Sequence, residues 1–284
     1  MKMKTVLVTL MLLFVFTIPG CSKESTGTNQ NQPEPEIPEP PGWELVWSDE
    51  FNGTAIDKSN WNHETGGHGW GNNELEYYTD RPANSYIQEG NLVIEAKKEN
   101  FGGREYTSAR MTTKGKRFFK YGRVEARIKL PFGQGIWPAF WMLGESISSV
   151  GWPKCGEIDI MEMIGGGENR DDTVHGTAHW YESESAGHQF MGGHRELPDP
   201  QIFAGDFHVF AIEWDQTAIK WFLDGQNYYS FDITPPSRSE FHDNFFIILN
   251  VAVGGNWPGS PDATTVFPQK MFIDYVRVYR KAAD

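Results

Sequence analysis

The chain has 284 residues, of which 39% are hydrophobic, so it can bury a sizeable core in one or two domains and is not disordered as a whole. Its formal net charge of −13, from 38 acidic and 25 basic residues, argues against nucleic acid or an anionic membrane surface as a partner, because the long-range field repels polyanions. The 30 Gly, 17 Pro and 14% aromatic residues argue against a helical bundle and predict strands, turns and aromatic surfaces.

The first residues predict export. Lys2 and Lys4 precede an apolar run over residues 6–18, which is too short for an ordinary membrane span and typical of the core of a signal peptide. The Ile-Pro-Gly-Cys sequence that ends at Cys21 resembles a bacterial lipoprotein signal, in which the Cys is lipidated and becomes the mature N-terminus. We therefore expect residues 1–20 to be removed and the protein to be an outer-membrane or cell-surface lipoprotein. The alternative is a plain secretory signal, which would give a secreted or periplasmic protein.

Residues 21–41 are predicted to form a tether. Polar residues lead into a segment, residues 33–41, in which prolines alternate with glutamates. Such a composition buries too little apolar surface to offset its chain entropy. In a polyproline II conformation, at about 3 Å per residue, the tether would hold a domain up to about 60 Å from a membrane anchor. A generic linker is the alternative, and residues 42–284 are expected to form one domain.

The rest of the chain is dense with short segments of alternating polarity. Residues 121–130 place Arg123 and Glu125 on one face and Val124 and Ala126 on the other, which is the period of a strand. No amphipathic helical pattern of a dozen residues competes with these segments, so we predict an all-β fold of two packed antiparallel sheets, a β-jelly-roll sandwich. The other predicted strands cover residues 91–96, 107–113, 207–214, 219–223, 245–251 and 271–279.

The segment Glu157-Ile-Asp-Ile-Met-Glu162 holds three carboxyl groups. In a regular strand Glu157 and Asp159 would share one face, whereas Glu162 would point among isoleucines, where a charge is costly. One extra residue, a β-bulge near residues 160–161, would return Glu162 to the face of the other two. We therefore predict three carboxyl groups in one stripe.

Three carboxyl groups in one stripe could catalyse cleavage of a glycosidic bond by acid–base chemistry. With the bulge, Glu157 and Glu162 are about four strand steps apart, and their side chains can close to the roughly 5–5.5 Å of retaining glycosidases. The longer separation of inverting enzymes is also within reach. Like charges at this distance raise the pKa of at least one carboxyl, which lets one act as an acid beside an ionised nucleophile. A solvated acidic stripe is the alternative.

The surrounding sequence resembles glycoside hydrolase family 16, and within it the laminarinase-like endo-β-1,3-glucanases. Their E-[IL]-D-[IV]-x-E motif matches Glu157–Glu162 at every position, and the resemblance extends over residues 43–279. It implies a jelly-roll with a cleft across its concave sheet, Glu157 as nucleophile, Glu162 as acid/base and Asp159 as an assisting carboxyl. Further matching segments are WSDEFNG (47–53), WGNNELEYYT (70–79), SARMT (108–112), GIWPAFWML (135–143), HGTAHW (175–180) and IDYVRVY (273–279).

Aromatic residues are expected to bind sugar rings, which offer flat C–H faces with hydroxyls at the rim. Trp137 and Trp141 have the same strand parity among small neighbours and are predicted to stack on the substrate; the alternative is two core tryptophans. For His179 two interpretations stay open, a hydrogen bond to a catalytic carboxyl and an ordinary strand histidine. The substrate contacts that the resemblance adds are Asn72, Glu74, Arg110, His179, Trp180 and Trp257.

A metal prediction rests on Asp274, which falls in phase with Phe272 and Val276 on an apolar face of its predicted strand, where a lone carboxylate is unfavourable. The resemblance implies a structural calcium ion on the convex face, with ligands at Glu50, the Gly90 carbonyl and Asp274, and hard oxygen ligands suit calcium. An Asp that is hydrogen-bonded to the backbone is the alternative. Catalysis by paired carboxyls needs no cofactor.

The predicted function is retaining endo-hydrolysis of β-1,3-glucosidic bonds in laminarin-type glucans, with mixed β-1,3-1,4-glucan as an open extension. The alternatives are a relative acting on agar, carrageenan or xyloglucan, and a non-catalytic sugar-binding module. No zinc or nucleotide motif is present. The expected partner is a β-glucan, with no nucleic acid, with membrane contact only through the lipid anchor, and with the chain a monomer. Cys155 is expected to be a buried filler without a disulfide partner.

Overall fold

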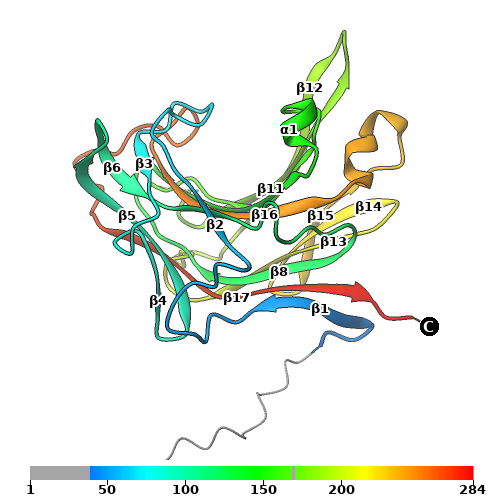
Figure 1. The fold of residues 1–284 in the computed structure, drawn as a ribbon, viewed down its shortest axis with the longest axis horizontal. Coiled ribbons are helices and arrows are strands. Elements are labelled where there is room, and N and C mark those ends of the chain that lie inside the picture. The colour runs from blue at the N-terminus through cyan, green and yellow to red at the C-terminus, as the bar shows by residue number, and fades with distance from the viewer. Residues whose placement is uncertain (1–38, 168–169, 284) are drawn as a thin grey trace, which may run out of the picture. The chain divides into compact units, whose positions relative to one another are not determined.

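A computed structural model describes residues 39–167 and 170–283 of the chain (Figure 1). The predicted signal peptide, the lipidation site Cys21 and all of the tether before Glu39 lie outside the described residues. In the part that is described, none of the helices has both the length and the apolar character that a membrane span requires.

Two sheets make up the fold. The larger has ten strands in the order β15-β14-β13-β8-β17-β5-β6-β3, with β1 paired to β17 and β4 paired to β5. The pairing is antiparallel except between β3 and β6. Its strands are β1 (Trp43–Asp49), β3 (Glu76–Tyr78), β4 (Ser85–Gln88), β5 (Asn91–Phe101), β6 (Arg104–Ser108), β8 (Gly122–Lys129), β13 (His208–Trp214), β14 (Ala218–Leu223), β15 (Gln226–Asp232) and β17 (Gln269–Lys281).

The smaller sheet has seven strands in the order β12-β11-β10-β9-β16-β7-β2. Two short helices, α1 (Ile147–Val150) and the 3₁₀ helix η1 (Pro236–His242), complete the described elements. The strands of this sheet are β2 (Asn62–Glu64), β7 (Arg110–Thr112), β9 (Ile136–Gly144), β10 (Glu157–Glu162), β11 (Thr173–Ser183), β12 (Gly187–Glu196) and β16 (Phe245–Val253).

Alternating side chains hold the two sheets together. In β8, Val124, Ala126 and Ile128 are fully buried in the core between the sheets, while Arg123 and Glu125 lie on the outer face and pair with each other at 2.8 Å. The predicted alternation and the all-β jelly-roll sandwich are therefore confirmed. Burial of this continuous apolar layer, at roughly 25 cal/mol per Å², is the main stabilising contribution.

The predicted strand over residues 107–113 is wrong as a single element. The chain leaves the larger sheet at the end of β6, where it pairs with β5, and enters the smaller sheet with β7, where it pairs with β16. Ala109 lies between the two strands and is fully buried. The period-two pattern continues across this crossing, which is why the sequence alone does not reveal it.

The two faces of the smaller sheet differ. Along β11, the even-numbered residues Val174 and Ala178 are fully buried in the core, whereas His175, Thr177 and His179 alternate with them on the opposite face. In Figure 1, β12 and α1 rise on one side of this open face, and β3 and β6 lie on the other. The open face of β9, β10 and β11 is therefore the floor of a cleft.

Candidate active site

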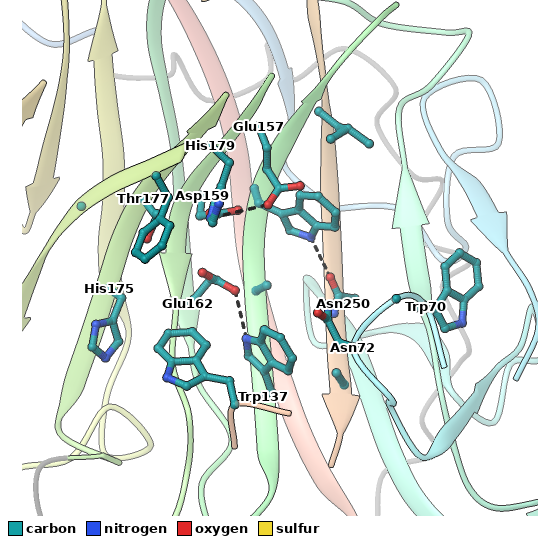
Figure 2. Close-up of a pocket in the computed structure, with 18 of the residues that line it drawn as sticks. Trp70, Asn72, Trp137, Glu157, Asp159, Glu162, His175, Thr177, His179 and Asn250 are labelled. Atoms are coloured by element: carbon teal, nitrogen blue, oxygen red, sulfur yellow. Dashed lines mark hydrogen bonds and ion pairs between the residues drawn. The ribbon is translucent and has the colours of Figure 1, made fainter. Parts of the chain in front are cut away.

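Strand β10 carries the three carboxyl groups, and its register contains the predicted bulge. Asp159 pairs with Thr177 and Glu162 with His175, so three steps along β10 match two steps along β11. The pairing with β9 shifts at the same place, between Asp159 and Met161. Because of the extra residue, Met161 is fully buried in the core and Glu162 turns to the side of Glu157 and Asp159, as Figure 2 shows.

The carboxyls lie in a cleft with a cavity of about 790 Å³. Its lining residues come from strands across most of the smaller sheet, from Phe190 on the edge strand β12 to Arg110 on β7, and from the loops that carry Trp70, Asn72 and Trp257. A groove that crosses a sheet in this way accommodates an extended ligand.

Each carboxyl has a different partner. Glu157 Oε2 accepts a hydrogen bond from Trp152 Nε1 at 3.1 Å, and Glu162 Oε1 accepts one from Trp137 Nε1 at 3.0 Å. The third group, Asp159, is 2% exposed, and its Oδ2 lies 3.1 Å from His179 Nε2. Within residues 39–167 and 170–283, no Lys or Arg forms an ion pair with these three groups.

Burial is the main cause of the raised pKa values of these three carboxyls. It raises the pKa of Glu157, of Asp159 and of Glu162 to about 8 in each case. The neighbouring charge of Asp159 raises the pKa of both glutamates further, while His179 opposes the shift. The cluster therefore retains protons at neutral pH, which is the condition for one carboxyl to serve as an acid beside an ionised neighbour.

Trp137 and Trp141 both line the cleft and are half-buried, so they are not core residues. Trp141 Nε1 donates to Asn250 Oδ1 at 2.7 Å, and the Arg110 guanidinium lies 4.7 Å from the centre of its ring. Trp257 is 40% exposed and stands edge-on to Trp137, with ring centres 5.7 Å apart. The structure thus brings these predicted contacts into one cleft.

Asn72 and Glu74 also line the cleft. Glu74 is only 5% exposed, and it accepts hydrogen bonds from Tyr78 Oη at 3.0 Å and from Asn72 Nδ2 at 3.3 Å. Tyr78 Oη in turn lies 3.2 Å from Asn250 Nδ2, which donates to it. Glu74 therefore orients Asn72. It also belongs to a hydrogen-bond network that runs through Tyr78 and Asn250 to Trp141.

The predicted substrate contact of Trp180 is wrong. Its side chain is 4% exposed and packs in the core against Phe231, with ring centres 5.1 Å apart. The physical reason is the alternation of β11, because a residue next to His179 must point to the other face of the sheet. His179 itself points into the cleft, so the ordinary strand histidine is not supported.

The basis of the calcium prediction is also wrong. Strand β17 shifts its register against β8 between Ile273 and Tyr275, so Asp274 leaves the apolar face and its side chain is 37% exposed. Asp274 pairs with Arg127 at 2.8 Å, and Glu50 accepts two hydrogen bonds from Arg277 at 3.0 and 2.8 Å. Both carboxylates are thus neutralised by guanidinium groups and do not fit calcium as side-chain ligands, while Gly90, at φ +74°, occupies the turn between β4 and β5.

Several cleft residues were missed by the sequence reasoning. His175 and Thr177 share the parity of His179 on β11, and Asn250 interrupts the apolar run of β16, so patterns could have identified these three. Trp152, in contrast, reaches Glu157 from a loop and has no periodic signal. Cys155 is buried against Leu143, Phe246 and Ile248 as expected, and burial raises the pKa of its thiol to about 12.

Known proteins resemble this chain over most of its described length. The sequence profile of glycosyl hydrolases family 16 matches residues 71–277. The Beta-glucanase of Rhodothermus marinus is 46% identical, with 84% of this chain and 86% of that protein aligned. The Glucan endo-1,3-beta-glucosidase A1 of Niallia circulans is 38% identical, with 89% of this chain and 42% of that protein aligned, so the chain matches less than half of that protein. The crystal structure of the laminarinase catalytic domain from Thermotoga maritima MSB8 superposes with a TM-score of 0.78 at 51% identity, covering 85% of this chain and 99% of that one. This chain therefore belongs to glycosyl hydrolases family 16.

Proposed function

We propose that the protein is a retaining endo-β-1,3-glucanase that cuts laminarin-type glucans. The observation that carries this proposal is the bulged strand β10, which places Glu157, Asp159 and Glu162 together on the floor of the cleft. A sugar-binding module has no use for three carboxyls in one cleft whose pKa values are raised. The names of the relatives with similar sequences support a β-1,3-glucan as the substrate.

In the first step, Glu162 donates its proton to the glycosidic oxygen while Glu157 attacks the anomeric carbon from the opposite side, giving a covalent glycosyl-enzyme. Glu162 is suited to the acid role because burial keeps its pKa near 8. The Trp137 Nε1–H, at 3.0 Å, fixes the direction in which its carboxyl points.

In the second step, Glu162 takes a proton from water as the water attacks the same anomeric carbon, and Glu157 leaves as a carboxylate. Two displacements at one carbon return the original β configuration. Asp159 lies two residues after Glu157 on the same face of β10, and its negative charge raises the pKa of Glu157, so gain or loss of a proton at Asp159 adjusts Glu157 between the two steps.

The cleft chemistry favours a neutral polymer. Its floor is acidic, and the chain as a whole carries a net charge of −13, so a sulfated galactan would be repelled. Trp137, Trp141 and Trp257 supply apolar faces for pyranose rings, and Asn72 and Arg110 supply polar groups at their edges. Mixed β-1,3-1,4-glucan is proposed as a second substrate, because these groups recognise ring faces and not one linkage alone.

A reducing-end assay on laminarin, lichenan, agarose and carrageenan tests the proposal. We expect rapid release of reducing ends from laminarin, slower release from lichenan and none from the two galactans. ¹H NMR of the first product should show the β-anomer before mutarotation. Faster cutting of agarose or carrageenan would assign the cleft to another polymer, and no cutting of any substrate would favour a binding module.

Export and assembly are proposed on the sequence alone. We propose that Cys21 carries the lipid of an outer-membrane or cell-surface lipoprotein, that residues 21–41 tether the catalytic domain, and that the protein is a monomer. Expression of the full chain and of Cys21→Ala, followed by detergent phase partitioning, tests the anchor. The native chain should enter the detergent phase, and equal partitioning of the two would reject lipidation. Sedimentation of the domain gives the oligomeric state.

A further inference from the structure

Two histidines connect the buried carboxyl Asp159 to the edge of the cleft. His179 Nε2, on β11, lies 3.1 Å from Asp159 Oδ2 and 3.8 Å from Glu157 Oε1. The other nitrogen of the same ring, Nδ1, lies 2.9 Å from Nε2 of His188 on the edge strand β12. Asp159, His179 and His188 thus form a continuous chain of polar contacts that ends at an exposed imidazole. Figure 2 shows its inner half, from Asp159 to His179.

The position of His188 is set by aromatic neighbours. The Trp152 ring centre lies 4.5 Å from that of His188, and Phe190 packs against both histidines at 6.0 and 5.7 Å. Trp152 also donates to Glu157 Oε2. The imidazole of His188 is therefore held against the nucleophile's own hydrogen-bond partner while it remains open to water.

Hydrogen bonding restricts the tautomers of this pair. When His188 Nε2–H donates to His179 Nδ1, the proton of His179 lies on Nε2, 3.1 Å from Asp159 Oδ2, where it favours Asp159 as a carboxylate. Among the described residues Asp159 Oδ2 has no aligned hydrogen bond, so a proton passes between the two only when their side chains turn toward each other. When His179 Nδ1–H donates to His188 Nε2, the bare His179 Nε2 faces Asp159, which must then hold a proton to make the contact favourable. The protonation of Asp159 and the tautomers of both rings are coupled.

We propose that His188 and His179 form a proton path between solvent and Asp159. Water delivers a proton to His188 Nδ1, the Nε2 proton of His188 moves to His179 Nδ1, and the Nε2 proton of His179 moves to Asp159 Oδ2. Each ring gains one proton and loses one, so the net change is one proton from solvent to Asp159. The reverse sequence releases it. His188 acts through His179 and is a positioning residue.

The proton path would let Asp159 gain or lose a proton during each turnover of the proposed reaction. The inference therefore rests on the proposed function. Formation of the glycosyl-enzyme moves the negative charge from Glu157 to Glu162, and hydrolysis moves it back. Asp159 lies between them on β10, so its preferred protonation changes within each turnover. A polymer that covers the cleft floor blocks direct access of water to Asp159, which is 2% exposed, whereas His188 lines the same cleft at its rim, on the edge strand β12, and is exposed.

The surroundings of His188 favour its neutral form. The ionisable groups that face the histidines are Glu157, Asp159 and Glu162, all on β10. Lys154, in the loop after α1, lies 3.4 Å from Glu184 in an exposed ion pair. Burial, and next the neighbouring His179, lower the pKa of His188. A neutral His188 has a free ring nitrogen with which to accept a proton from water.

Three variants distinguish a role of His188 in proton transfer from a purely structural role. His188→Gln keeps an amide that donates to His179 Nδ1 but cannot pass a proton on. His188→Ala leaves space for added imidazole. The matched control is His208→Gln, the same substitution on β13 of the larger sheet, at a residue that does not line the cleft. For each protein, kcat and KM on laminarin are measured from pH 4 to 9, and ¹³C NMR follows the carboxyl carbon of Asp159 over the same range.

We expect His188→Gln to lower kcat about tenfold, the size of a modest proton-transfer contribution, with little change in KM. Imidazole should restore kcat in His188→Ala, and the pH profile of His208→Gln should match the native one. In the native protein the chemical shift of the Asp159 carboxyl carbon should change at the pH at which His188 titrates. In His188→Gln this change should be absent. Native kcat in His188→Gln at every pH, or an unchanged Asp159 titration, would overturn the path. If the native protein leaves laminarin intact, the proposed function fails, while the NMR titration still decides the coupling.

Discussion

Two surfaces of this protein carry carboxylates in opposite electrostatic settings. On the outer face of the larger sheet, Glu125 is 5% exposed and its Oε2 lies 2.8 Å from Arg123, and Glu50, Glu95 and Asp274 are likewise paired with Arg277, Lys270 and Arg127. On the cleft face of the smaller sheet, Asp159 is 2% exposed, and among the described residues His179 is the one basic group in ion-pair contact with its carboxyl. Glu125 and Asp159 are similarly buried, but the group that each contacts differs.

This difference shows that the partner of a buried carboxyl, and not its burial, decides its role. A guanidinium beside a carboxylate stabilises the charged form and ties the group into the fold. Without such a cation, burial raises the pKa and leaves the group reactive, as at Asp159, whose pKa is about 8. Perturbed carboxyls gathered in a cleft are typical of a catalytic site.

The largest effect should come from the cleft glutamates. Glu157→Gln and Glu162→Gln should each lower kcat on laminarin by at least about 10³-fold, because an amide is neither a nucleophile nor an acid. Circular dichroism should show an unchanged fold. Glu213→Gln, on the outer face, is the control and should stay within about twofold of native activity. More than a tenth of native turnover in either cleft variant would contradict the assignment.

The two faces of the smaller sheet can be separated with tryptophans. Trp180→Ala should lower the free energy of unfolding by about 3–5 kcal/mol, because it empties a core site, and leave KM unchanged in the folded fraction. Trp141→Ala should raise KM on laminarin with a smaller loss of stability. Urea unfolding and initial rates measure both. An increase in KM for Trp180→Ala, with native KM for Trp141→Ala, would reverse our assignment of faces.

Charge removal should have opposite signs on the two surfaces. Between pH 4 and 8 the folded state keeps the proton of Asp159 that the unfolded chain releases near pH 4, so this group makes stability fall as pH rises. Asp159→Asn removes the penalty and should stabilise the protein by about 1–3 kcal/mol at pH 8 and by almost nothing at pH 4.

Glu125→Gln, in contrast, removes the nearest partner of Arg123 and should destabilise by about 1.5–3 kcal/mol at pH 8. Urea unfolding of both variants at pH 4, 6 and 8 measures this comparison. Equal signs for the two variants at pH 8 would show that their partners do not distinguish the two carboxyls.

The smallest effect that we expect is a change in melting temperature when calcium is removed or added. Since Arg277 and Arg127 already neutralise Glu50 and Asp274, we expect a chelator, or added calcium, to move the melting temperature by less than about 1 °C. Calorimetry of the native chain checks this. A larger, calcium-reversible shift would show that backbone carbonyls near Gly90 bind the ion in spite of the ion pairs.

Local chemistry explains how much the sequence could predict. The sheets, the cleft carboxyls and the bulge followed from the period of two and from the cost of burying Glu162. Trp180 was misplaced because a motif was followed where the alternation with His179 already excluded it. The crossing at Ala109, the shift in β17 and the reach of Trp152 depend on pairing and loop geometry between distant segments, which no local pattern encodes.

The most direct test of the account is to trap the nucleophile. A 2-deoxy-2-fluoro-β-laminaribiosyl fluoride slows both steps but leaves the fluoride easy to expel, so a glycosyl ester should accumulate. Mass spectrometry of a digest should then show one added 2-deoxy-2-fluorolaminaribiosyl group, a disaccharide, on the peptide that contains Glu157, and fragmentation should place it on that residue. An ester on Asp159 or Glu162, or no ester while laminarin is cut with inversion, would contradict the central claim.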